Sequence, residues 1–148
     1  MRNEFGDLME PGAGGVFRCH SMLSDAMLRT AAERGFRVVT VELAGSRDKN
    51  AVLAALAKAL AFPEYFGHNW DAFYDCLLDL EEETGDGTLL VLRDISGFAK
   101  AEPEEFAAAV DALMDAAEYW DDEGKSLLAV VELDAAVLAP DLPELNLT

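Results

Sequence analysis

The sequence predicts an α/β fold, with a small sheet of three to four mainly parallel strands packed with helices. The first reason is the order of the elements, because short apolar or β-branched runs alternate with segments of helical periodicity. The second is the character of the runs at 88–93 and 126–133, which are apolar almost throughout, as in parallel strands covered on both faces. The third is size, since 148 residues with 51% hydrophobic content suffice for one domain with its own core.

The first half of the chain contains two predicted strands and two predicted helices after an irregular start. Residues 1–14 hold a proline and several glycines and show little periodicity, so we expect a loose leader. Ser24 or Asp25 can cap the first helix. Asp48 can cap the second helix, which Pro63 ends. The expected elements are a strand at 15–20, a helix at 25–34, a strand at 36–43 and a helix from 49 toward 62.

The second half follows the same pattern with one longer helix. Asn69 is the expected N-cap of its first helix, and Pro103 stands at the first position of its second. The chain after residue 133 contains two further prolines, so we expect this tail on the surface. The expected elements are a helix at 70–80, a strand at 88–93, a helix at 103–120 and a strand at 126–133.

Charge is distributed unevenly along the chain. There are 29 acidic and 11 basic residues, which gives a net charge of −18. Residues 1–47 are neutral, and between residues 71 and 123 there are 17 acidic residues and 2 basic ones. Such a chain repels nucleic acid and anionic membranes, so neither is expected as a partner. A basic protein is the expected partner, and a surface that is acidic only for solubility is the alternative.

The compartment follows from the start of the chain and from the cysteines. The first residues show no secretory signal, and no run approaches the roughly 20 apolar residues that span a bilayer. Cys19 and Cys76 lie in separate segments and form neither a CxxC motif nor a disulfide framework, so free thiols are expected. We therefore expect a cytoplasmic protein.

Enzyme signatures are scarce. The sequence contains no GxSxG, P-loop, GxGxxG or HExxH motif, so we expect neither an enzyme nor a cofactor. His68 lies near Asp71, but no spacing rule places a nucleophile with them. Asp71, Asp75 and Asp79 fall every fourth residue and share one ridge of the helix. A hard cation could bind there, but a solvated acidic face is the simpler interpretation, and no metal site is predicted.

Two helices place acidic residues where they destabilise the helix. Asp71, Asp75 and Asp79 lie away from the apolar stripe of their helix, and like charges four residues apart repel by roughly a few tenths of a kcal/mol. No basic residue in the helix offsets this repulsion. The long helix repeats the arrangement with Asp111, Asp115 and Glu118. Acidic residues beside aromatic ones, at a cost to their own helix, indicate contact with a basic partner.

The run from Phe62 to Leu77, FPEYFGHNWDAFYDCL, resembles the signature of the barstar family, intracellular inhibitors of barnase-type ribonucleases. The order of elements over about residues 36–133 is also similar to that family. The resemblance implies a barstar-like domain at 35–134. It implies further that residues 1–34 are an N-terminal extension, a loose leader followed by a strand and a helix added to the sheet, and that 135–148 form a C-terminal tail.

The resemblance also implies roles for single residues. Asp75 corresponds to the acid that enters the active site of the nuclease and takes the place of a substrate phosphate there. Asp71 corresponds to a second interfacial acid one turn earlier, and Tyr65 to an aromatic residue that packs on the partner.

Further positions match less directly. Gly67 and Asn69 match the bend before the binding helix, and Tyr74 stands where an aromatic residue precedes the key acid. Asp115, or Glu118 in its place, lies about where the family has a further acid on its last long helix. The predicted partner-binding set is Tyr65, Asn69, Asp71, Tyr74, Asp75, Asp79 and Asp115.

The preferred function is a stoichiometric protein inhibitor of a basic, secreted-type ribonuclease, and the expected partner is such a ribonuclease or a related toxin. Its acidic helix and the preceding loop would block the active-site cleft and protect the producing cell. Two alternatives remain at this point. One is an acidic interaction module with a basic partner that is not a nuclease, and the other is a small metal-dependent hydrolase built on the ridge Asp71–Asp75–Asp79.

Overall fold

Four strands form one sheet in the order β1-β4-β3-β2, and every pairing is parallel. The structure is a computed structural model that describes residues 4–9, 13–63, 68–80 and 87–145. The predicted fold class is confirmed, and the short first strand joins as the fourth. The strands are β1 (Gly15–Cys19), β2 (Phe36–Glu42), β3 (Gly87–Arg93) and β4 (Ser126–Glu132). The helices are η1 (Asp7–Met9), α1 (Asp25–Glu33), α2 (Lys49–Ala59), α3 (Trp70–Leu78), α4 (Ser96–Ala101) and α5 (Pro103–Asp122).

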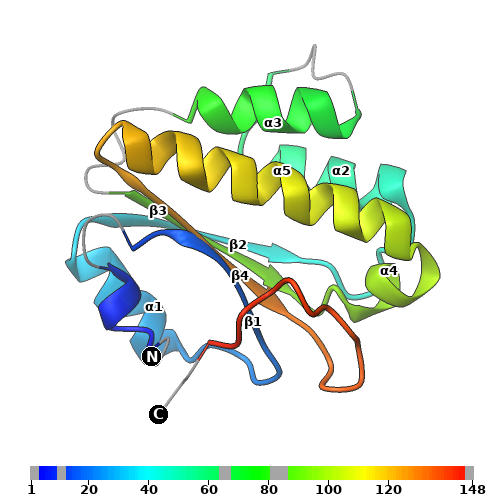
Figure 1. The fold of residues 1–148 in the computed structure, drawn as a ribbon, viewed down its shortest axis with the longest axis horizontal. Coiled ribbons are helices and arrows are strands. Elements are labelled where there is room, and N and C mark those ends of the chain that lie inside the picture. Colours follow the sequence, from blue (N-terminus) through cyan, green and yellow to red (C-terminus); the bar gives the residue numbers. More distant parts are fainter. Residues whose placement is uncertain (1–3, 10–12, 64–67, 81–86, 146–148) are drawn as a thin grey trace.

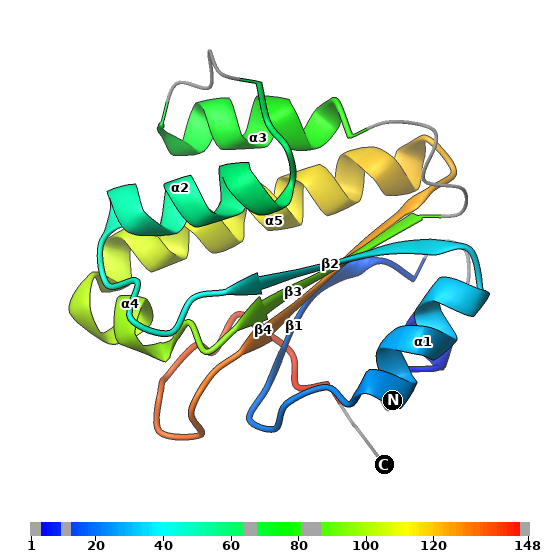
Figure 2. The same cartoon turned by 180° about the vertical axis from the view of Figure 1, so that it is seen from behind.

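Helices cover both faces of the sheet. Figures 1 and 2 show α2, α3, α4 and α5 on one side and α1 with the N-terminal turn on the other. The reason lies in the connections. The chain crosses the sheet from β1 to β2 in one direction and returns through β3 to β4 in the other, so right-handed crossovers place the two sets of helices on opposite faces.

The two central strands are buried at every position, as their apolar runs predict. Successive side chains point to opposite faces and enter two separate cores. Leu90 and Leu92 pack under α2, α3 and α5, whereas Leu89 and Val91 belong to the core beneath α1. The sheet is thus the middle layer of three.

The predicted caps are present. The Ser24 hydroxyl accepts a hydrogen bond from the Met27 N–H at 3.2 Å, and an Asp48 carboxylate oxygen accepts one from the Ala51 N–H at 2.8 Å. Several helices differ from expectation, and α2 ends at Ala59 instead of continuing toward residue 62. The short helix α4 was not predicted, because its N-cap is Ile95, which makes no side-chain capping bond. Helix α3 ends at Leu78 instead of Leu80.

Both ends of the chain contribute to the fold, which corrects the expectation of a loose leader and a surface tail. In the described part of the leader, η1 and its flank bury Phe5, Leu8 and Met9 in the core beneath α1. In the described part of the tail, Leu145 is buried, and its N–H donates to the Arg18 carbonyl at 2.7 Å. These segments are too short to show periodicity. The tail satisfies backbone groups on the outer edge of β1, which would otherwise be open to pairing.

A buried ion pair joins the carboxyl ends of β3 and β4. Arg93 Nη1 lies 3.3 Å from Glu132 Oε2, which also accepts a hydrogen bond from the Leu23 N–H at 3.1 Å. Arg93 Nη2 donates to the Leu23 carbonyl at 3.4 Å. Burial raises the pKa of the Glu132 carboxyl, while the Leu23 N–H and Arg93 act against that rise. The pair attaches the segment before α1 to the sheet.

Candidate protein-binding site

The start of α3 is set by Asn69, as predicted. Its backbone is extended (φ −142°, ψ 169°), and its side-chain oxygen accepts a hydrogen bond from the Ala72 N–H at 2.8 Å. The preceding residue, His68, has φ 49°, a left-handed conformation that residues other than glycine adopt at a cost. The chain therefore turns sharply into the helix at a defined point.

Apolar packing determines which side of α3 faces outward. Phe73 and Leu77 are fully buried in the core beneath the helix. The Phe73 ring contacts that of Phe62, at a centroid distance of 6.1 Å, and that of Trp70, at 5.7 Å. Between these two buried positions Asp75 is exposed, whereas Tyr74 and Cys76 are half-buried, because successive residues of a helix are rotated by about 100°.

Two indole N–H groups hold α3 against α5. Trp70 Nε1 donates to Glu105 Oε1 at 3.0 Å near the start of both helices, and Trp120 Nε1 donates to the Leu77 carbonyl at 3.0 Å near their ends. Figures 1 and 2 show α3 on the outer side of α2 and α5, farthest from the sheet. The helix is thus fixed at both ends, and its outer side faces solvent.

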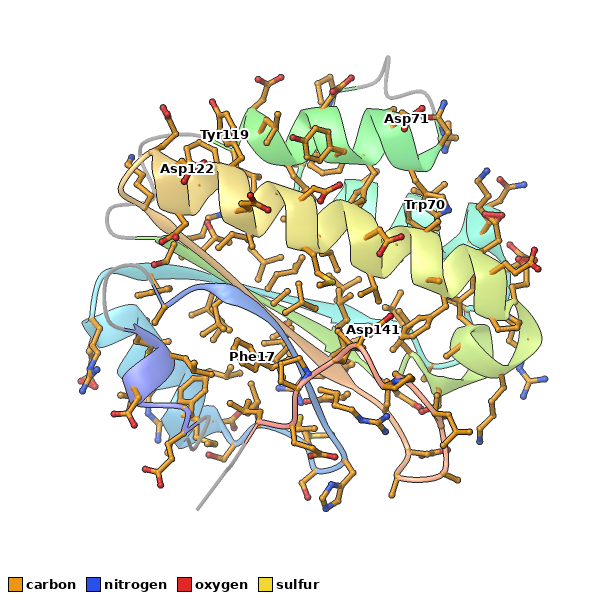
Figure 3. The ribbon with its side chains drawn as sticks, viewed as in Figure 1. Phe17, Trp70, Asp71, Tyr119, Asp122 and Asp141 are labelled. Carbon is orange, nitrogen blue, oxygen red and sulfur yellow. The ribbon has the colours of Figure 1, made fainter. Side chains whose placement is uncertain are left out.

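The predicted acids of α3 lie on this outer side. Asp71 and Asp75 are both exposed and lie one turn apart. Figure 3 shows Asp71 at the N-terminal end of the helix. Tyr74 is half-buried and packs against the core. Asp79 is exposed and is the C-cap residue of α3, so it lies at the end of the helix, after Asp71 and Asp75. Its N–H bonds to the Cys76 carbonyl at 3.1 Å, which tightens the last turn.

The long helix α5 adds acids beside those of α3. Asp115 and Glu118 are both exposed, and so are Asp111 and Asp122 on the same helix. Figure 3 shows Asp122 at the far end of α5 from its contact with α4. Since α3 packs along α5, the exposed acids of the two helices lie on neighbouring elements. Tyr65 and Gly67 lie outside the described residues.

The thiol of Cys76 lies on α3 among the acidic residues of that helix. Burial raises the pKa of the Cys76 thiol, and the negative charges of Asp79 and Asp75 raise it further. This thiol therefore stays protonated at neutral pH and is a poor nucleophile. Within the described ranges, no group of three or more His, Cys, Asp or Glu side chains is placed to hold a metal ion. The ridge Asp71–Asp75–Asp79 thus gives no such group.

Sequence reasoning assigned no role to Glu105 and Trp120, which hold α3 in place. Glu105 belongs to the acidic first turn of α5, and Trp120 lies near its end. Both contacts join residues 35 or more positions apart. Local periodicity carries no signal for such pairs, since they depend on how the two helices pack.

Comparison with known proteins agrees with this geometry. The family model Barstar (barnase inhibitor) matches residues 36–132, well over half of the chain. The match includes α3, α5 and three of the four strands, while β1, α1 and the tail lie outside it. A comparison with curated proteins finds no match. No helix in the described part of the chain is long and apolar enough to cross a membrane. The chain therefore belongs to the barstar family of barnase inhibitors.

Proposed function

We propose that this chain is a stoichiometric inhibitor of a basic ribonuclease and acts in the cytoplasm of the cell that makes the nuclease. One observation carries the proposal. The family match coincides with an outward-facing helix, held at both ends by indole hydrogen bonds, that exposes Asp71 and Asp75 one turn apart. The chain is a binding protein on this account and not an enzyme.

In the proposed mechanism, the inhibitor blocks the active-site cleft of the nuclease, and a carboxylate replaces a substrate phosphate there. A nuclease cleft binds phosphates through cationic side chains, and Asp75 would enter it and take the place of one phosphate. Its lost hydration would be offset by charge-assisted hydrogen bonds from the cations of the cleft. Because α3 is already ordered, little conformational entropy would be lost on binding. The net charge of −18 would accelerate encounter with a basic partner.

The other predicted residues would support this contact. Asp71 would meet a second cation one turn before Asp75, and Tyr65 would pack on the nuclease surface. Asn69 would act by setting the start of α3, which its capping bond supports. The proposed contact set is completed by Tyr74, Asp79 and Asp115. Glu118 lies next to Asp115 on the exposed side of α5.

The test is a titration of ribonuclease activity. Purified chain is added to barnase, and in parallel to the secreted ribonuclease encoded nearest to its gene, and RNA cleavage is measured at fixed enzyme concentration. We expect the activity of at least one enzyme to fall linearly and to vanish at an equimolar ratio. The double variant Asp71→Asn/Asp75→Asn keeps the shape and removes two charges, so it should inhibit much less. Full activity of both enzymes in excess of the unmodified chain would contradict the proposal.

A further inference from the structure

An apolar hollow lies between the first half of α5 and the loop that follows β4. Its volume is about 170 Å³. Its lining comes from two segments far apart in the sequence, and Figure 3 shows Asp141 of the loop beside α5. The buried apolar side chains that line it are Ala99, Phe106, Val110, Val137 and Leu142.

The rim of the hollow is acidic. Asp111 of α5 and Asp141 of the loop both line it and are both exposed, and its described lining contains no Lys, Arg or His. Leu138, also part of the lining, is 90% exposed, which is unusual for so large an apolar side chain. The hollow therefore combines an apolar interior with negative charge at its edge.

The loop that forms one wall is held in place by β1. The buried Arg18 side chain donates from Nη1 to the Val137 carbonyl at 2.6 Å and from Nη2 to the Asp134 carbonyl at 2.9 Å. Within the loop, the Leu142 N–H donates to the Ala139 carbonyl at 3.0 Å. Charge-assisted bonds of this kind from a buried guanidinium fix the wall before any ligand arrives. A preformed hollow loses little free energy to ordering on binding.

We infer that this hollow receives one large apolar side chain, flanked by Lys or Arg, from a basic segment of the nuclease. The inference rests on the proposed function. Its volume suits such a side chain, since an apolar cavity of about 150 Å³ holds a benzene molecule. Asp111 and Asp141 complement basic flanks. Asp115 follows Asp111 by one turn, so the hollow continues the acidic side of α5 toward the tail. The loop wall lies outside the family match, so this contact would add specificity particular to this chain.

Small probes of matched shape test the chemistry without any nuclease. The ¹⁵N-labelled chain is titrated with phenylbutylamine, with neutral phenylbutanol and with anionic phenylbutyrate. We expect saturable shifts of the amide signals of residues 106–111 and 137–142, with the amine bound about five-fold more tightly than the alcohol. The variant Asp111→Asn/Asp141→Asn should lose this preference. Asp25→Asn/Glu33→Gln, which removes the same charge from α1 across the sheet, should keep it.

Two further results decide the inference. Ala107→Trp, which narrows the hollow without changing charge, should abolish the shifts in a chain whose melting curve shows that it is folded. Shifts spread over the whole acidic surface, or an amine preference that survives Asp111→Asn/Asp141→Asn, would overturn the inference.

The last measurement is the affinity of the chain for the inhibited ribonuclease. Asp111→Asn/Asp141→Asn should weaken binding of the inhibited ribonuclease about five-fold while inhibition remains equimolar. Unchanged affinity would overturn the assignment of the hollow to the nuclease, even where the probes bind. Failure of the unmodified chain to inhibit either ribonuclease would instead contradict the proposed function. The probe titrations need no nuclease, so they would still show whether the hollow binds a basic apolar group.

Discussion

Ala61 ends α2 in a conformation that suits glycine. Its φ is 55°, and the bonds around it form a Schellman motif, with the Phe62 N–H on the Ala57 carbonyl at 2.9 Å and the Ala61 N–H on the Lys58 carbonyl at 3.3 Å. The motif turns Phe62 inward onto Phe73. The helix therefore stops before Pro63, and the proline marks the boundary without creating it.

Replacing Ala61 with glycine should stabilise the fold. Glycine removes the cost of the left-handed conformation, about 1–2 kcal/mol, and loses part of that gain through its freer unfolded state. We expect Ala61→Gly to raise the free energy of unfolding by about 0.5–1 kcal/mol in urea titrations. As a control, Ala54→Gly at an exposed position inside α2 should destabilise by about 1 kcal/mol. An Ala61→Gly chain less stable than the parent would show that the motif is not strained.

Among single-residue features, the sequence predicted those that depend on residues nearby in the chain. The caps at Ser24, Asp48 and Asn69 are side-chain bonds to a residue three positions on, so the local sequence specifies them. The end of α3 was predicted two residues too late, because the last turn of the helix tightens where Leu80 enters the core. That depends on the far side of the helix and not on the spacing of acids.

Among the elements, the junction of β3, β4 and the segment before α1 depends on one buried charge pair. The side chains of Arg93 and Glu132 are 11% and 9% exposed, whereas those of Lys100 and Asp134 are 57% and 58% exposed. Removing one partner of a buried pair leaves an uncompensated charge, while an exposed pair contributes little. The two pairs therefore provide a matched comparison.

Arg93→Met should destabilise strongly and Lys100→Met only slightly. We expect losses of about 3–5 kcal/mol for Arg93→Met at neutral pH and less than about 1 kcal/mol for Lys100→Met. Urea unfolding of both variants under identical conditions measures the difference. Equal losses would show that the Arg93–Glu132 pair is not effectively buried in solution.

The effect of Arg93→Met should also depend on pH. Burial raises the pKa of Glu132 in the folded state, so between its ordinary and its raised pKa the folded chain binds more protons than the unfolded chain. Stability then falls as pH rises through that interval. Loss of Arg93 raises the pKa further and extends the interval upward. The destabilisation should therefore be smaller at about pH 5 than at about pH 7.5, and a loss that grows on acidification would contradict this assignment.

Strands and long helices were predictable from the sequence, while the short pieces were not. The strands β3 and β4 were expected because each has a continuous apolar run through its middle, and α5 because its apolar stripe persists for about three turns. Helix α4, η1 and the tail pairing on β1 each involve few residues. Helix α4 packs on the core beneath α5, η1 on the core beneath α1 and the tail on the edge of β1, and these surfaces exist only after the strands have assembled.

Over the whole molecule, the net charge of −18 should make stability sensitive to salt. Self-repulsion among acids is screened as the Debye length falls from about 10 Å at 0.1 M salt to about 4 Å at 0.5 M. We expect the Tm to rise between low ionic strength and about 0.5 M sodium chloride, measured by calorimetry. A Tm that stays flat or falls would show that the acids are compensated locally.

The segments outside the family match complete the architecture. Without β1, α1 and η1, the side chains of Leu89, Val91, Leu128 and Val130 would lack their cover. The division of the chain at residues 34 and 134 stays a prediction. The placement of the acids of α3 indicated a basic partner, but a nuclease could be proposed only through the resemblance of residues 62–77, because an acidic ridge alone does not identify the partner. Their support by Trp70 and Trp120 follows from tertiary packing.

On the proposed function, Asp75 of α3 takes the place of a phosphate in a nuclease cleft. The most direct measurement is calorimetric titration of the inhibited ribonuclease with the parent chain, Asp75→Ala and Asp79→Ala, beside the melting curve of each. Losing one partner of a buried, hydrogen-bonded charge pair costs about 2–5 kcal/mol or more, a range for which barnase–barstar is itself a reference case. We predict a loss of that size for Asp75→Ala, a loss of about 1 kcal/mol or less for Asp79→Ala, and unchanged folding for both. Parent-like affinity of Asp75→Ala would contradict the claim, and unfolding of that variant would show Asp75 to be structural.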